Sequence, residues 1–265
     1  MERPTARWLS WPPAFAFHVE PMGSVIAVSN QKGGVGKTTS VVNLAGLCAL
    51  AGKRVLVIDS DPQGNATSVL APGHTGDSIY ARGKPVASTI AGVDCCPSGS
   101  DLIDQERALH RDGDGHFRLR QLMDPYRPVY DVVFVDCPPN LSFLPTNALL
   151  ASDWLLVPLQ CEYYALEGLS QLLAYIEHLR ETAGAKIELA GVLLTMHQPE
   201  SPLARQVVDE IHRHFPDNPF RHPIPRDLAL AAAPSHSAAG YLYDPLSPGA
   251  VAYLAAAKEL LHVIG

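Results

Sequence analysis

Residues 31–39 read QKGGVGKTT and have the types and order needed to hold a chain of phosphates. Glycines let backbone N–H groups turn inward around phosphate oxygens, and the N-terminus of a following helix adds the positive end of its dipole. In such a loop Lys37 would reach the β and γ phosphates, and the Thr38 hydroxyl would coordinate Mg²⁺. Glycines are also common in ordinary turns, but a Lys-Thr pair between an apolar strand and a helix favours a nucleotide-binding loop.

Three aspartates at the ends of apolar runs supply the carboxylates that such chemistry needs. Asp59 and Asp61 follow the run that begins at residue 54, and Asp136 closes the run VVFV at 132–135. A carboxylate at the carboxyl edge of a parallel sheet faces bound phosphates, and the setting of Asp136 is typical of a Walker B residue that holds Mg²⁺. Carboxylates after strands also cap helices, so this second interpretation of Asp61 stays open.

A second lysine, Lys32, stands at the start of the loop and departs from an ordinary phosphate-binding loop. It cannot easily share the phosphates of its own site with Lys37. We therefore interpret Lys32 as reaching across a two-fold interface to the nucleotide of a second copy. The alternative is a solvated lysine on a surface turn.

Short apolar runs that alternate with helix-length segments would position these groups. This alternation predicts an α/β fold in which a doubly wound, mostly parallel sheet is flanked by helices, as a single domain with its ligand at the carboxyl ends of the strands. The stretch 71–92, rich in glycine, proline and small polar residues, is predicted to be an exposed excursion. The expected strands are 25–29, 54–59, 132–136, 154–158 and 189–195, and the expected helices are 37–51, 141–151, 165–183, 203–215 and 248–263.

Composition limits the remaining possibilities. The chain has 265 residues, 47% of them hydrophobic, and a net charge of -7, which argues against a protein that coats nucleic acid through bulk positive charge. Five cysteines without disulfide or zinc spacing predict reduced thiols in a cytoplasm, with Cys95 and Cys96 as small buried side chains. No run approaches the ~20 apolar residues that span a bilayer. Residues 1–21 are predicted to be a disordered or artefactual leader before Met22, and residues 22–265 the domain.

Together these motifs resemble the ParA/Soj family of deviant Walker A P-loop ATPases, relatives of the MinD group. The resemblance extends from residue 22 to residue 261. Its landmarks are the loop at 32–39, DSDPQGN at 59–65, DCPP at 136–139, QCEYYALEG at 160–168 and APSH at 233–236.

The resemblance implies ATP or ADP and Mg²⁺ as cofactors and a slow, Mg²⁺-dependent ATP hydrolysis. It implies that Asp61 orients the attacking water and acts with Lys32 and Lys37, and that Asp59 and Asp136 join Thr38 around the metal. Two positions depart from the family pattern: Asn140 replaces a usual serine, for which we expect altered switching, and Asp227 replaces a usual asparagine. The implied nucleotide contacts are Lys32, Gly33, Gly34, Val35, Gly36, Lys37, Thr38 and Thr39, with Thr195, Pro225 and Asp227 near the base.

The family resemblance also implies an ATP-bound homodimer that binds nucleoid DNA without sequence preference in the cytoplasm. A ParB-like partner with a basic N-terminal tail would stimulate hydrolysis and complete a chromosome or plasmid partitioning cycle. Glu200 and Ala229 stand where relatives usually carry arginine, so both changes remove positive charge. The candidate DNA-binding residues are Arg205, Arg213, Arg221, Arg226 and Lys258, each of which could instead belong to a solvated surface.

Three alternatives remain open on the sequence. The same switch could position a cargo other than DNA, such as a chemosensory or compartment cluster. A membrane-positioning protein of the MinD type would need a basic amphipathic tail, whereas residues 258–265 contain one lysine and are predicted to end a core helix. A metabolic synthetase or reductase could use the same scaffold, although a reductase would need further suitably placed cysteines beside Cys137.

Overall fold

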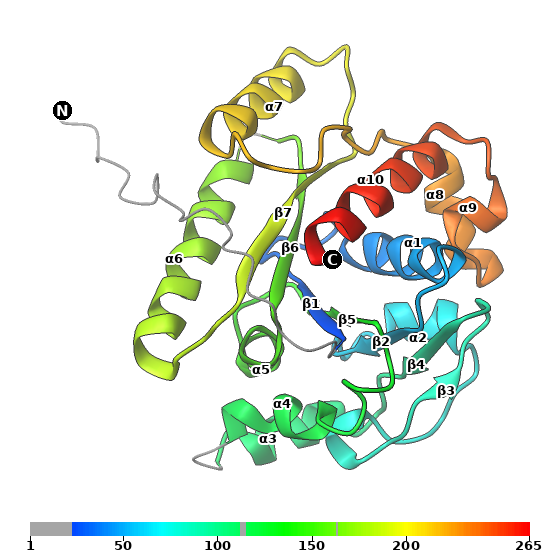
Figure 1. Cartoon of the computed structure of the whole chain (residues 1–265), viewed down its shortest axis with the longest axis vertical. Coiled ribbons are helices and arrows are strands. Elements are labelled where there is room, and N and C mark those ends of the chain that lie inside the picture. Colours follow the sequence, from blue (N-terminus) through cyan, green and yellow to red (C-terminus); the bar gives the residue numbers. More distant parts are fainter. Residues whose placement is uncertain (1–22, 112–114, 163) are drawn as a thin grey trace.

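The computed structural model describes residues 23–111, 115–162 and 164–265. The predicted leader, residues 1–21, lies outside this range, as does Tyr163 of the QCEYYALEG landmark. The described part of the chain forms a seven-stranded sheet in the order β3-β4-β2-β5-β1-β6-β7, and all neighbouring pairs are parallel except β3 with β4 (Figure 1). The strands are β1 Ser24–Val28, β2 Val55–Asp59, β3 Val86–Ala87, β4 Val93–Cys96, β5 Val132–Asp136, β6 Trp154–Gln160 and β7 Glu188–Thr195.

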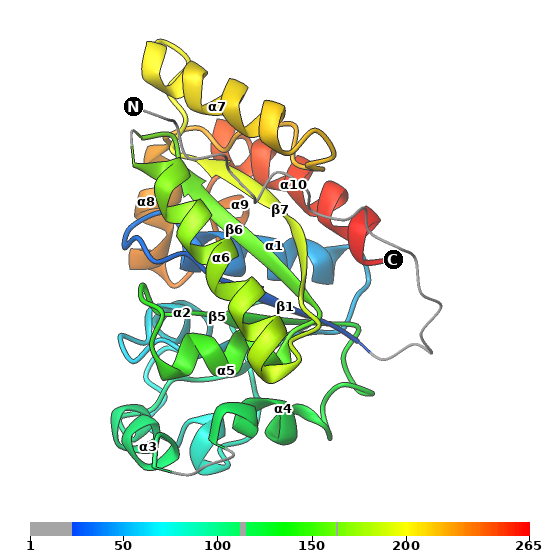
Figure 2. The ribbon, with the colours of Figure 1, turned by 90° about the vertical axis from the view of Figure 1, so that its left-hand side faces the viewer.

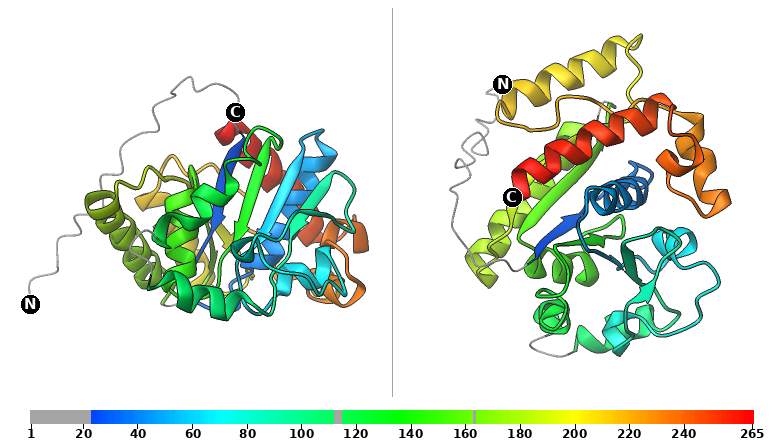
Figure 3. Two further views of the ribbon diagram at one scale, coloured as in Figure 1. Left: turned by 90° about the horizontal axis from the view of Figure 1, so that it is seen from below. Right: turned by 45° about the vertical axis from the view of Figure 1, so that its right-hand side comes forward.

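Helices cover both faces of the sheet and enclose two separate hydrophobic cores (Figure 2; Figure 3). The first core lies against α3 Leu102–Leu109, α4 Arg118–Met123, α5 Phe143–Ala151, α6 Ala165–Ala183 and α7 Pro202–His214. The second lies against α1 Lys37–Leu50, α2 Asn65–Leu70, α8 Leu228–Ala232, α9 Gly240–Tyr243 and α10 Pro248–Ile264. Short 3-10 helices are η2 Ile79–Ala81, η3 Gly115–Phe117 and η4 Ala233–His236.

Alternating side chains of the central strand reach opposite cores. Val25 and Ala27 of β1 belong to the first core, whereas Ile26 and Val28 belong to the second. A strand with both faces buried must be apolar at nearly every position, which explains the unbroken runs in the sequence. The predicted doubly wound, mostly parallel fold is confirmed.

The stretch 71–92 is less exposed than its composition predicts. Ile79, Tyr80 and Ile90 are buried, and the segment contains η2 and the edge strand β3. The prediction of an exposed segment is therefore wrong at these three positions, because a few apolar side chains pack this irregular segment onto the core. Cys95 and Cys96 are buried on β4, as predicted, and burial raises the pKa of Cys96 to about 12.

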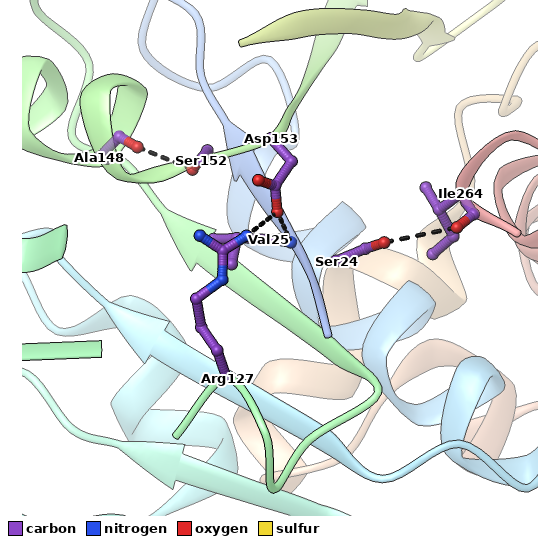
Figure 4. Close-up of polar contacts among 7 residues, drawn as sticks. All are labelled: Ser24, Val25, Arg127, Ala148, Ser152, Asp153 and Ile264. Carbon is purple, nitrogen blue, oxygen red and sulfur yellow. Dashed lines mark hydrogen bonds and ion pairs between the residues drawn. The ribbon is translucent and has the colours of Figure 1, made fainter. Parts of the chain in front are cut away.

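Separate polar contacts fix the chain at the amino ends of the strands (Figure 4). Asp153 accepts a hydrogen bond from the backbone N–H of Val25 at 2.9 Å and forms an ion pair with Arg127. The Ser24 hydroxyl donates to the backbone oxygen of Ile264 at 3.4 Å, so the start of β1 lies beside the end of α10. This edge is opposite to the one at which the candidate site forms.

Candidate functional site

The glycine-rich loop between β1 and α1 has the backbone that its sequence predicts. Gly34 and Gly36 have φ angles of 73° and 87°, in the left-handed region that glycine adopts without the strain imposed by a side chain. The Asn30 side chain fixes the start of the loop by donating to the Pro158 backbone oxygen at 2.8 Å. The Thr195 hydroxyl at the end of β7 donates to the backbone oxygen of Val35 at 2.9 Å. The loop is thus fixed to both neighbouring strands on that side of β1.

Lys37 opens α1 and points its ammonium group back into the loop. Its side chain is buried, and Nζ donates to the backbone oxygen of Lys32 at 3.1 Å. Burial lowers the pKa of Lys37, while the nearby Asp136 acts in the opposite direction. A phosphate oxygen is a stronger partner for this ammonium than a single carbonyl, so the arrangement fits a phosphate ligand.

Asp136 at the end of β5 carries the feature that most strongly indicates a cation. Its Oδ2 accepts a hydrogen bond from the Thr38 hydroxyl at 2.7 Å, whereas Oδ1 is buried without a hydrogen-bond partner among the described residues. Burial and the proximity of Asp59 raise the pKa of Asp136 well above its ordinary value. A buried carboxylate beside a hydroxyl, with one oxygen left over, is a donor set that fits Mg²⁺.

Asp59 and Asp61 follow β2 and make different contacts. Asp59 accepts hydrogen bonds from the Thr67 backbone N–H at 2.7 Å and from the Thr67 hydroxyl at 2.6 Å, and burial raises its pKa to about 6. It therefore fixes the turn into α2, and its predicted support of the metal would be a second task. Asp61 binds the backbone N–H of Gln63 at 2.9 Å and lines the cavity beside the loop.

Two cavities that share part of their walls form one groove along the site. The first, of about 380 Å³, is lined by the loop, Asp61 and Pro139, and it contains the predicted positions Gly33, Gly34, Gly36, Lys37, Thr38 and Thr39. The second, of about 560 Å³, is lined by Thr195, Pro225 and Asp227, the positions predicted near the base, and is called the base cavity below. Gly36, Thr39, Met196 and Leu230 line both cavities. The groove can therefore hold phosphates at the loop and a base beyond it.

The base end of the groove contains one predicted residue that is already engaged and one residue that sequence reasoning missed. Both oxygens of Asp227 accept backbone hydrogen bonds, from Ala229 at 2.7 Å and from Gly249 at 2.6 Å. Met196, which had no assigned role, has a φ of 49° at the junction of the two cavities. A left-handed non-glycine residue at a ligand groove is a recurrent sign of a functional constraint, but no sequence signal marks it.

Lys32 is not among the residues that line the cavities. Its ammonium forms an ion pair with Glu162, which follows β6, and both side chains are about half exposed. The Lys32 backbone N–H donates to Asn30 Oδ1 at 3.0 Å. The predicted contact with a second copy stays a prediction for this single chain. Glu162, part of a landmark motif without an assigned role, is the other residue that sequence reasoning missed.

The predicted DNA-binding residues are all exposed, but they occupy two separated places. Arg205 on α7 and Arg226 lie near the mouth of the base cavity, where Arg205 contacts the backbone oxygen of Pro199 and Arg226 N donates to His197. The remaining three lie toward the other end of α7 and α10. Arg213 pairs with Glu210 on α7. The Arg221 backbone N–H donates to Glu259 of α10, and Lys258 lies next to Glu259 on that helix.

Comparisons with known proteins agree with this geometry. A family profile described as an AAA domain matches residues 23–189. The chain is 42% identical to the sporulation initiation inhibitor protein Soj of Bacillus subtilis, over 90% of this chain and 98% of that protein. It is 39% identical to the chromosome partitioning protein ParA of Caulobacter vibrioides, over 89% and 93%.

A solved structure shares both the fold and a nucleotide site. Cobyrinic acid a,c-diamide synthase from Mycobacterium smegmatis, crystallised with ADP and magnesium, matches with a TM-score of 0.76 and 30% identity, over 91% of this chain and 95% of that one. Among the described residues no helix is long and apolar enough to span a bilayer. The chain has a phosphate-binding loop with aspartates around it, and it is near 40% identical to Soj and ParA over nine-tenths of its length. It therefore belongs to the ParA/Soj family of P-loop ATPases.

Proposed function

We propose that this ATPase is a nucleotide-driven dimerisation switch that partitions a chromosome or plasmid. ATP and Mg²⁺ are its cofactors. The observation that carries the proposal is the second lysine, Lys32, which stands beside the groove without lining it. A loop lysine that does not reach its own phosphates is available to those of a second copy, so ATP would join two chains and hydrolysis would separate them.

Each site residue has a task in the hydrolysis step. Backbone N–H groups of the loop and the ammonium of Lys37 bind the phosphates, and Asp61 orients the attacking water from the wall of the cavity. Thr38 and Asp136, with support from Asp59, would hold Mg²⁺, which neutralises charge on the phosphate oxygens when bound. Because phosphoryl transfer depends on positioning and charge more than on a strong base, we expect slow turnover until a partner completes the site.

The cargo and the partner complete the proposal. In the ATP state the cytoplasmic dimer binds nucleoid DNA without sequence preference, through Arg205 and Arg226 near the base cavity and Arg213, Arg221 and Lys258 beyond them. A ParB-like protein with a basic N-terminal tail stimulates hydrolysis and releases the DNA. Support comes from the relative described as a chromosome partitioning protein, and from the exposure of all five basic residues.

A DNA-binding titration with ATP, with ADP and without nucleotide, repeated at several salt concentrations, tests this function. We expect binding with ATP only, and a slope of log affinity against log salt of about -0.9 for each phosphate that the protein neutralises.

Arg226→Ala should make that slope shallower by about 0.9 for each phosphate that Arg226 binds in the parent. Arg107→Ala, on α3 and remote from both basic places, is the matched control. A slope that is the same in the Arg226 variant and the parent would remove Arg226 from the DNA surface.

A second candidate keeps the switch and replaces DNA by another cargo, such as a chemosensory or compartment cluster. The observation in its favour is electrostatic: Glu200 lines the same cavity as Arg226, and Arg213 is paired with Glu210. These carboxylates weaken the attraction to phosphates that a DNA surface needs. A dimer that forms with ATP but binds no DNA even at low salt would favour this candidate.

A further inference from the structure

The ion pair between Lys32 and Glu162 joins the ends of two neighbouring strands. Lys32 lies in the loop that follows β1, and Glu162 lies two residues beyond β6, the strand that pairs with β1 on one side. Neither backbone is loose: the Lys32 N–H binds Asn30 Oδ1, and the Glu162 N–H donates to Gln160 at 2.8 Å. The side chains therefore meet because the sheet places them side by side.

Both lysines of the loop contact groups of their own chain. Lys37 Nζ donates to the backbone oxygen of Lys32, and the Lys32 ammonium binds the Glu162 carboxylate. A triphosphate in the groove would take over Lys37, but the Lys32 ammonium would still be bound to its own subunit. A contact between Lys32 and the phosphates of a second copy must therefore compete with Glu162.

We propose that Glu162 is a positioning residue that holds Lys32 on its own subunit and so opposes ATP-dependent dimerisation. This inference rests on the proposed switch and adds a regulating group to it. Both side chains are about half exposed, so water and salt weaken the pair. An exposed pair of this kind is worth roughly a two- to fivefold change in an equilibrium constant. In a symmetric dimer two such pairs open, so the effect on the dimer dissociation constant is the square, roughly 4- to 25-fold.

The first measurement reads the ion pair without any dimer. Nucleotide-free protein is treated with a limiting amount of an acetylating reagent, and acetylation of Lys32 is followed by mass spectrometry. The reagent reaches the Lys32 nitrogen only while the ion pair is open, so Lys32 should be acetylated roughly two- to fivefold faster in Glu162→Gln than in the parent. The matched control is Glu167→Gln, which removes the same charge in the first turn of α6, where the carboxylate contacts Gln171. Equal rates in the parent and Glu162→Gln would overturn the proposal.

The second measurement is the dimer dissociation constant with a non-hydrolysable ATP analogue and Mg²⁺, by sedimentation. Glu162→Gln should lower it roughly 4- to 25-fold at low salt, and the difference should shrink at 0.5 M salt because the pair is screened. Glu167→Gln should match the parent. A purely structural effect of the substitution would not depend on salt.

The outcomes separate the two proposals. If the parent dimerises and Glu162→Gln dimerises equally or more weakly, the positioning role is overturned while the switch stands. If neither chain dimerises although both bind the analogue, the switch itself fails, and the positioning role with it. A parent that stays monomeric beside a Glu162→Gln variant that dimerises would support both.

Discussion

Buried charged groups that lack full sets of partners distinguish the site at the scale of single residues. One oxygen of Asp136 has no partner among the described residues, and Lys37 holds only a backbone carbonyl. Burial of such groups costs free energy that a folded chain recovers only when a ligand supplies the missing partners. The pattern therefore marks where charge of both signs must arrive together, as it does in a magnesium nucleotide.

Asp61→Ala is expected to separate nucleotide binding from hydrolysis. The Asp61 side chain lines the phosphate cavity, and among the described residues its hydrogen bond is to a backbone N–H of its own turn, so its loss should leave the loop intact. We expect ATP to bind, the dimer to persist, and phosphate release to fall to background, measured by light scattering and by a colorimetric phosphate assay. Asp104→Ala, which changes an exposed side chain of α3, is the control. Turnover at the parent rate would show that Asp61 does not orient the water.

The pH dependence of stability provides a test of Asp59. Burial raises its pKa from 3.8 to about 6, so between these values the folded chain binds a proton that the unfolded chain has lost. Stability from this group is therefore lost as pH rises from about 4 to about 6. Asparagine keeps an oxygen for Thr67 and carries no charge. The melting temperature of Asp59→Asn relative to the parent should rise across that window and stay level above it.

Asp131→Asn is the control of opposite sign for this experiment. Hydrogen bonds from Arg54 lower the pKa of Asp131 to about 2, so its contribution is present above the unfolded value and is lost as pH falls. The variant should therefore lose stability relative to the parent above about pH 4. If the difference between Asp59→Asn and the parent does not change with pH, the Asp59 carboxylate is not the buried group described above.

At the scale of elements, polar side chains hold the short helices of the base cavity in place. Asp227 caps α8 with one oxygen and binds the Gly249 N–H at the start of α10 with the other. Asp227→Ala should lower the free energy of unfolding by about 1–2 kcal/mol, as the loss of a helix cap does. Asp227→Asn should lose less, because its amide oxygen can still accept one of the two bonds. Urea unfolding followed by circular dichroism measures both.

The same pair of variants tests whether Asp227 contacts the base. With both oxygens engaged by the backbone, we expect ATP affinity to change little in Asp227→Asn under conditions where the chain stays folded. A tenfold weaker ATP affinity without loss of stability would instead assign the side chain to the base. Isothermal titration calorimetry with Mg²⁺ gives the comparison.

Long, uniform patterns in the sequence predicted the elements well, and short mixed segments did not. The apolar runs became β1, β2, β5, β6 and β7, because a strand buried on both faces needs apolar residues throughout. Strand β4 has only four residues and contains Asp94, whose carboxylate accepts a hydrogen bond from Tyr130, so no periodicity marks it. Buried Ile79 and Tyr80 were hidden in a segment of turn-forming composition.

The residues of the candidate site also divide into those that local sequence predicts and those that only the fold brings together. Loop glycines could be predicted because their left-handed backbone is a local requirement. The pairing of Lys32 with Glu162 joins positions 130 residues apart and follows from β6 lying beside β1, which the sequence does not state. The engagement of Asp227 by Gly249 depends likewise on how α8 packs against α10.

At the scale of the whole molecule, the sheet order explains why one edge carries the chemistry. Strands β2, β5 and β1 are neighbours at the centre of the sheet, so Asp59, Asp136 and the glycine-rich loop emerge at the same edge. Asp59 and Asp136 are direct partners in the register of β2 with β5. Residues from three distant parts of the sequence thus meet at one edge of the sheet.

The contact between the Ser24 hydroxyl and the Ile264 backbone oxygen brings the two ends of the described domain together. A short glycine-serine linker from residue 264 back to residue 23, with new ends opened in the exposed turn at Gly73, should give a circular permutant with the original fold. We expect its melting temperature to fall by several degrees while ATP affinity is retained. Such rearranged chains would allow fluorescent reporters to be inserted at Gly73 without placing them at the ends of β1 or α10.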